Sequence, residues 1–214
     1  MHRYIREPIN GFTHLAGALL SIVALIAMVM KASASNSTLE VTAVIIFGVS
    51  MILLYGASAT YHMVIAKDNV LAWLRKLDHS MIFILIAGTY TPFCLITLNG
   101  TIGWVLFSIV TAVAISGVIF KMVWFKCPRW LSTGLYIAMG WMIIFVAVPL
   151  SSNIAATGLF LLILGGVIYT IGGVIYATKP KFLESKYLGF HEIFHIFILL
   201  GTLAHFLSVY LYVL

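Results

Sequence analysis

The sequence predicts an all-α integral membrane protein, a bundle of seven transmembrane helices with a cytosolic N-terminus and an extracellular C-terminus. Two observations predict this class. Apolar residues make up 63% of the 214 residues and charged residues only 8%, whereas a soluble domain is about half apolar and about a quarter charged. The apolar residues also fall into runs long enough to cross a bilayer. We therefore expect residues 1–214 to form a single membrane domain that contacts lipids and no nucleic acid.

Seven apolar stretches of roughly 20 residues provide the predicted helices. The connections between them are short, which favours a compact up-and-down bundle. The shortest break is at Asn99-Gly100, and a six-helix alternative would merge two stretches. Pro92 and Pro149 are expected to be tolerated kinks. The stretches cover residues 12–31, 41–65, 77–98, 101–120, 130–149, 155–178 and 189–213.

The distribution of basic residues predicts the orientation. In a seven-helix arrangement one side carries 11 of the 12 basic residues and the other only Lys31, and the basic side of a membrane protein faces the cytosol. On this topology Cys94 and Cys127 lie near opposite faces, so we expect no disulfide. The 11 residues are Arg3, Arg6, Lys67, Arg75, Lys76, Lys121, Lys126, Arg129, Lys179, Lys181 and Lys186.

A cleaved signal peptide is the alternative for the first stretch. Arg3 and Arg6, the apolar run and the small residues 32–34 loosely match its pattern. However, the run is long enough to span the bilayer, and Lys31 lies beside the supposed cleavage site. We therefore expect a permanent helix.

Polar and ionisable side chains at three helix ends indicate a functional site, because such groups are costly within a membrane. The topology places all of them at one depth near the cytosolic face, although they are far apart in the chain. They are Ser58 and His62 in the second stretch, Asp78 and His79 in the third, and His191, Glu192 and His195 in the seventh.

The pattern H-E-x-x-H at His191, Glu192 and His195 predicts a zinc site. Its two histidines are four residues apart and present their imidazoles to one metal ion. A catalytic zinc usually takes three protein ligands and leaves a fourth position to water, and His62 is the natural third ligand. Asp78 could then hold or deprotonate that water.

Each of these residues also has an ordinary structural explanation. His62 alone could be a hydrogen-bonding residue at the interface. Asp78 could be a helix N-cap, and Ser58 could bond to the backbone of its own helix. Glu192 lies about 100° around the helix from the first histidine, so it could face neighbouring polar groups or the cytosol.

Two further histidines and a glycine repeat are assigned mainly to packing. His14, a turn into the first stretch, could join the outer shell of the site, although we favour a structural role. His205 is expected to lie far from the site and to be structural. The letters G-G-V-I-Y occur at residues 165–169 and again at 172–176. This spacing predicts one smooth glycine face for close helix packing, with a flexible gate as the alternative.

Together these residues resemble the hemolysin III family, the bacterial branch related to the progestin and adipoQ receptors. The resemblance covers the chain from its first stretch to its last. The matching elements are Glu7-Pro8-x-Asn10-x-x-Thr13-His14, Ser58-x-x-x-His62, Asp78-His79-Ser80, Ala87-Gly88-Thr89-Tyr90-Thr91-Pro92-Phe93 and His191-Glu192-Ile193-Phe194-His195.

The resemblance implies a seven-helix protein of the bacterial plasma membrane with a zinc site near the inner leaflet. It places His62, His191 and His195 on the metal, with Asp78 and Ser58 near the bound water. The wider superfamily includes alkaline ceramidases, which hydrolyse lipid amides. In receptor relatives the residue that matches the glutamate of H-E-x-x-H need not be acidic, which argues against a protease-like role for it here.

Three functions follow as hypotheses. The first is a zinc-dependent hydrolase of a lipid amide or ester, with Asp78 as the base and Ser58 orienting the water or the oxyanion. The second is a receptor-like sensor of membrane state with a structural zinc. The third is a pore-forming cytolysin, although the sequence has no amphipathic insertion segment. The first two would suit a role in membrane lipid or fluidity homeostasis.

Overall fold

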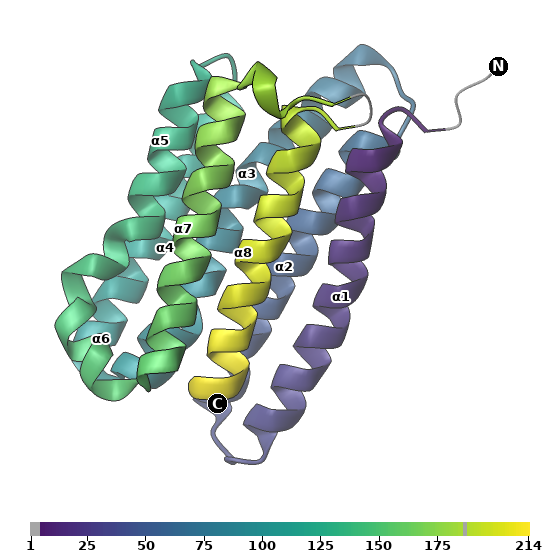
Figure 1. Ribbon diagram of the computed structural model, residues 1–214. Coiled ribbons are helices and arrows are strands. Elements are labelled where there is room, and N and C mark those ends of the chain that lie inside the picture. Colours follow the sequence, from purple (N-terminus) through teal and green to yellow (C-terminus); the bar gives the residue numbers. More distant parts are fainter. Residues whose placement is uncertain (1–4, 186–187) are drawn as a thin grey trace.

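The computed structural model describes residues 5–185 and 188–214, and within them every regular element is a helix (Figure 1). Arg3 and Lys186, two of the 11 basic residues that predict the orientation, lie outside the described residues. The elements are α1 Pro8–Ser33, α2 Thr38–Met63, α3 Asp68–Pro92, the π-helix η1 Phe93–Leu98, α4 Gly100–Val123, α5 Arg129–Gly140, the 3₁₀-helix η2 Trp141–Val146, α6 Ala147–Asn153, α7 Ala156–Thr178, the 3₁₀-helix η3 Lys181–Leu183 and α8 Phe190–Tyr212.

Seven helical spans within the described residues are long and apolar enough to cross a membrane, which confirms the predicted class. The third span combines α3 with η1, and the fifth combines α5, η2 and α6. α1 begins and α8 ends at opposite ends of the bundle, as an odd number of spans requires (Figure 1). The end where α1, α3, α5 and α8 begin is called the basic end below, because it carries the described Lys and Arg residues apart from Lys31.

The short break after the third span is a true reversal, so the six-helix alternative is wrong. Asn99 and Gly100 both have a positive φ, of 41° and 68°, a conformation that glycine adopts without steric cost. The Gly100 N–H donates to the Asn99 side-chain oxygen at 2.7 Å. Both cysteines are free, as predicted, and both are buried.

The third span begins earlier than the sequence predicts, at Asp68 and not at residue 77. Its first turns carry several charged residues, which hydropathy excludes from a span but which an α-helix accommodates at the membrane surface. The N-cap of α3 is Lys67. Asp78 therefore lies well inside the helix, and its interpretation as an N-cap is wrong.

Both predicted proline positions coincide with irregular helix. Pro92 is followed directly by the π-helical turn η1. In the fifth span, Pro149 has no N–H to donate to the carbonyl of Phe145, which lies in the 3₁₀ segment η2. Such segments inside a long helix often mark functional regions.

The glycine repeat of α7 packs closely, as predicted, but against two neighbours instead of one. A Cβ on Gly165 or Gly172 would meet side chains of α8 at 2.7 Å, whereas Gly166 and Gly173 face side chains of the fifth span. Adjacent residues point about 100° apart on a helix, so each glycine pair serves two interfaces. The expectation of a single glycine face is therefore wrong.

The interior contains two apolar clusters. One is centred on α1, α2 and α8 and includes Phe47 and Met51, and the other is centred on α3, α4 and α5 and includes Phe83 and Met139. Large apolar side chains such as Val148 remain exposed on the outside of the bundle. This arrangement suits a protein whose solvent is lipid.

Candidate metal centre

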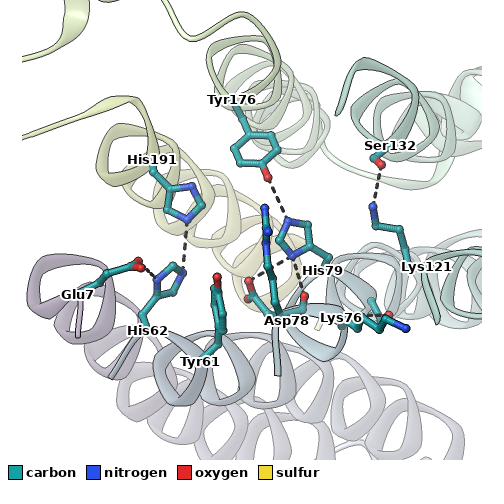
Figure 2. A network of polar contacts seen from close by, with 12 residues as sticks. Glu7, Tyr61, His62, Lys76, Asp78, His79, Lys121, Ser132, Tyr176 and His191 are labelled. Atoms are coloured by element: carbon teal, nitrogen blue, oxygen red, sulfur yellow. Dashed lines mark hydrogen bonds and ion pairs between the residues drawn. The ribbon is translucent and has the colours of Figure 1, made fainter. Parts of the chain in front are cut away.

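Three histidines from two helices converge at the basic end. His62 lies in the last turn of α2, and His191 and His195 lie in the first turns of α8. Their ligand atoms all lie within 4.8 Å of one another, and the Nε2 atoms of His62 and His191 are 3.4 Å apart (Figure 2). The structure therefore brings together the three residues that the sequence predicts as metal ligands, and this cluster could hold a metal ion.

Glu7 orients the first of these histidines. Its Oε2 lies 2.5 Å from Nδ1 of His62, and its backbone N–H donates to the His62 carbonyl at 3.0 Å. Burial acts to raise the pKa of Glu7, but the hydrogen bond with His62 and the positive charges nearby outweigh it and lower the pKa. An ionised carboxylate only accepts, so the Nδ1–H donates and the Nε2 lone pair is directed at His191. Metal-binding histidines typically have such a carboxylate partner.

The donor set fits a zinc ion. Nitrogen ligands of tetrahedral zinc lie about 2.0–2.1 Å from the metal, which places them about 3.4 Å apart. The two Nε2 atoms have this separation. Nδ1 of His195 is buried and has no hydrogen-bond partner among the described residues. The chemistry of three imidazoles suits zinc.

Sequence reasoning missed the contact between Glu7 and His62. The residue was visible in the motif Glu7-Pro8-x-Asn10, but an isolated acidic residue before the first span has no partner until α1 and α2 are packed. The one indication of this contact was that Glu7 precedes the first predicted helix, at the same end of the bundle as the histidines.

Glu7→Gln should weaken zinc binding about ten- to a hundredfold, because it removes the carboxylate that fixes the tautomer of His62. Zinc affinity of the purified protein, measured by competition with a chelator, tests this. Glu184→Gln is the matched control, because Glu184 is an exposed glutamate near the same end. Equal affinities for the two variants would contradict the assigned role of Glu7.

Glu192 holds helices together. Its Oε1 accepts from Asn10 Nδ2 at 2.8 Å, and its Oε2 accepts from the Gly189 N–H at 2.9 Å. The second contact caps the start of α8, and the first attaches α1 to α8. Both carboxylate oxygens are thus engaged, as the structural interpretation expects, and Glu192 differs from a protease base.

His14 lies against the cluster. Its ring stacks on His195 with the centroids 3.6 Å apart and the planes 5° apart, and it meets Tyr55 edge-on at 5.1 Å. His14 is buried between these rings. Its ring therefore supports a candidate ligand by packing.

A cavity of about 140 Å³ adjoins the cluster. Its lining includes Ser58 and Asp78, the two residues predicted to act beside the metal, together with His191 and His195. Ser58 is 1% exposed and Asp78 is 9% exposed, and the Ser58 hydroxyl interacts with the Asp78 carboxyl group. Polar groups at one end of the cavity are thus available to a bound molecule.

The wall of the cavity is mainly apolar further from the cluster. It extends to His205, which lies ten residues beyond His195 on α8, a rise of about 15 Å. His205 is therefore far from the cluster, as predicted. Apolar residues of the wall include Ile82, Leu85, Ile86, Phe93 and Leu162.

His79 is held by three hydrogen bonds to described residues. Its Nδ1–H donates to the Arg75 carbonyl at 2.9 Å, and the Tyr176 hydroxyl donates to its Nε2 at 3.0 Å (Figure 2). The Tyr136 hydroxyl donates to the His79 carbonyl at 3.0 Å. His79 thus ties α3 to α5 and α7 beside Asp78. Tyr176 is the last residue of the second copy of the glycine repeat. That repeat predicts helix packing, and nothing in it indicates that Tyr176 contacts His79.

Comparison with known proteins yields one consistent match. The family model described as "Haemolysin-III related" matches residues 2–206. "Hemolysin-3" of Bacillus cereus is 42% identical over 215 aligned positions, covering 100% of this chain and 95% of the relative. "Hemolysin-3 homolog" of Bacillus subtilis (strain 168) is 41% identical over 209 positions, covering 97% and 95%.

Proposed function

The chain belongs to the hemolysin III family, and from this premise and the geometry of its histidine cluster we propose that it is a zinc-dependent hydrolase of a membrane lipid. The bond cleaved would be an amide or an ester. One observation carries the proposal: two of the three clustered histidines, His191 and His195, line a cavity that is also lined by Ser58 and Asp78. Structural zinc sites are usually closed by four protein ligands, whereas catalytic sites keep one position open.

The cavity supports a lipid as the substrate. Ser58 and Asp78 line it together with His191 and His195, and much of the remaining wall is made of leucine, isoleucine and aromatic side chains. An apolar pocket with a few convergent polar groups is the usual form of a small-molecule site. In this protein the apolar part would hold an acyl chain while the amide or ester lies near the histidines.

Asp78 and Ser58 divide the remaining chemistry. Zinc, when bound, polarises a carbonyl and makes water more acidic. Asp78 then serves as the general base that takes a proton from the attacking water and passes it to the departing amine or alcohol. Ser58, which lines the same cavity as Asp78, orients the water or stabilises the oxyanion.

The basic end would face the cytosol, so that the substrate enters from the inner leaflet of the plasma membrane.

Reporter fusions test this orientation. We expect cytosolic signals on the basic side and external signals on the other, because basic residues are retained in the cytosol. An external signal at Arg75 would contradict the orientation. The cytosolic positions are Arg75, Arg129 and Lys181, and the external positions are Asn36, Asn99 and Asn153.

A sensor of membrane state is the second candidate, because the contacts at the cluster join helices. Glu7 contacts His62, and Asn10 contacts Glu192, which links the start of α1 to α2 and α8. A zinc ion would strengthen this junction. Lysis, which the names of the relatives suggest, is a third candidate that dye release from reconstituted vesicles would test.

A further inference from the structure

Two cations from different parts of the chain lie near one aromatic ring at the basic end. Arg129 is the first residue of α5, Lys179 is the C-cap that follows α7, and Phe190 is the first residue of α8. The Cζ of Arg129 lies 5.9 Å and the Nζ of Lys179 lies 5.0 Å from the centroid of the Phe190 ring. Both positive charges thus lie near one ring, although the two residues are 50 positions apart in the chain.

Neither cation makes an ion pair with a described carboxylate. Nη1 of Arg129 is also buried and lacks a hydrogen-bond partner among the described residues. α5 begins at Arg129 without a side-chain cap, so the positive end of its helix dipole lies at the same place. A buried donor without a partner is costly, and these positive groups are complementary to an anion.

The two cations lie beside the candidate metal centre. The ring of Tyr176 is 5.7 Å from the Arg129 Cζ and 5.6 Å from the ring of His191. Tyr176 and His191 both line the cavity. One aromatic ring therefore separates the guanidinium from a candidate ligand, so one lipid molecule can reach both places.

We propose that Arg129 and Lys179 bind the phosphate of an anionic lipid headgroup. This rests on the proposed function in one respect: the lipid bound would be the substrate, with its ester or amide near the histidines and its acyl chain in the cavity. Arginine offers a fork of N–H donors and lysine a point charge, the pair of groups that commonly binds phosphate. The substrate would then be a phospholipid, and uncharged lipids would bind weakly.

Equilibrium binding of a fluorescent short-chain phosphatidic acid to the purified protein in an uncharged detergent tests this site. Unlabelled phosphatidic acid, phosphatidylcholine with the same chains and inorganic phosphate serve as competitors. We expect phosphatidic acid to compete best. Arg129→Met should weaken its binding at least about tenfold, the size of effect expected for a charged hydrogen bond. Lys126→Met, which removes an exposed charge from the preceding connection, should leave binding unchanged.

Lys179→Met and Arg129→Lys keep the test decisive if Arg129→Met fails to fold, and both should bind more weakly than wild type. Equal binding by wild type and these variants would overturn the site. Inorganic phosphate that competes as well as the lipid would overturn its assignment to a headgroup. Binding requires no turnover, so Arg129-dependent binding without hydrolysis would overturn only the proposed function. Hydrolysis without Arg129-dependent binding would overturn only this site.

Discussion

Alanine at His191 or His195 should remove the zinc that the purified wild-type protein is expected to carry. We expect about one zinc per chain in the wild type and less than about a tenth of that in either variant, because a site with two protein ligands holds zinc poorly. His62→Ala should have the same effect, since its Nε2 lies 3.4 Å from that of His191. Elemental analysis of protein purified without added metal measures the change.

His205→Ala is the matched control. It removes a buried histidine from the same helix and the same cavity, but about 15 Å along α8 from His195. It should keep its zinc. If His191→Ala and His195→Ala both kept the full zinc content, the ion would be bound elsewhere in the protein.

The sequence predicts the bundle well because few backbone structures are stable inside a bilayer. Every backbone group must be bonded inside the membrane, so apolar runs become helices. Asn99 and Gly100 mark a reversal because both adopt positive φ. The predicted start of the third span is too late. Hydropathy measures how well a segment partitions into lipid, whereas the helix itself also includes charged residues such as Asp68.

The histidine cluster is predictable for a second reason. Helix geometry places residues four apart on one face, which pairs His191 with His195, and the alternation of spans brings the end of α2 to the start of α8. Depth in the membrane is thus available from the sequence. Rotation about each helix axis is not, and it decides lateral contacts such as the stacking of His14 on His195 and the hydrogen bond of Tyr176 to His79.

Asp78→Asn should separate an enzyme from a protein with a structural zinc. Asparagine keeps the shape of the side chain but cannot act as a base, so a hydrolase should lose about a hundred- to ten-thousandfold of its turnover. Zinc content should remain high, because the three histidines are unchanged. Release of product from a lipid amide or ester in reconstituted membranes measures the turnover, and elemental analysis of the same sample measures the zinc.

Two variants calibrate the result of Asp78→Asn. Asp68→Asn changes an exposed carboxylate in the first turn of the same helix and should keep full turnover. His62→Ala removes a ligand and should impair both an enzyme and a sensor. Wild type that releases no product, together with an unchanged membrane-fluidity phenotype in Asp78→Asn cells, would exclude the hydrolase. That pattern would favour the sensor, in which zinc only joins helices and a buried carboxylate in the adjoining cavity can be neutralised without loss.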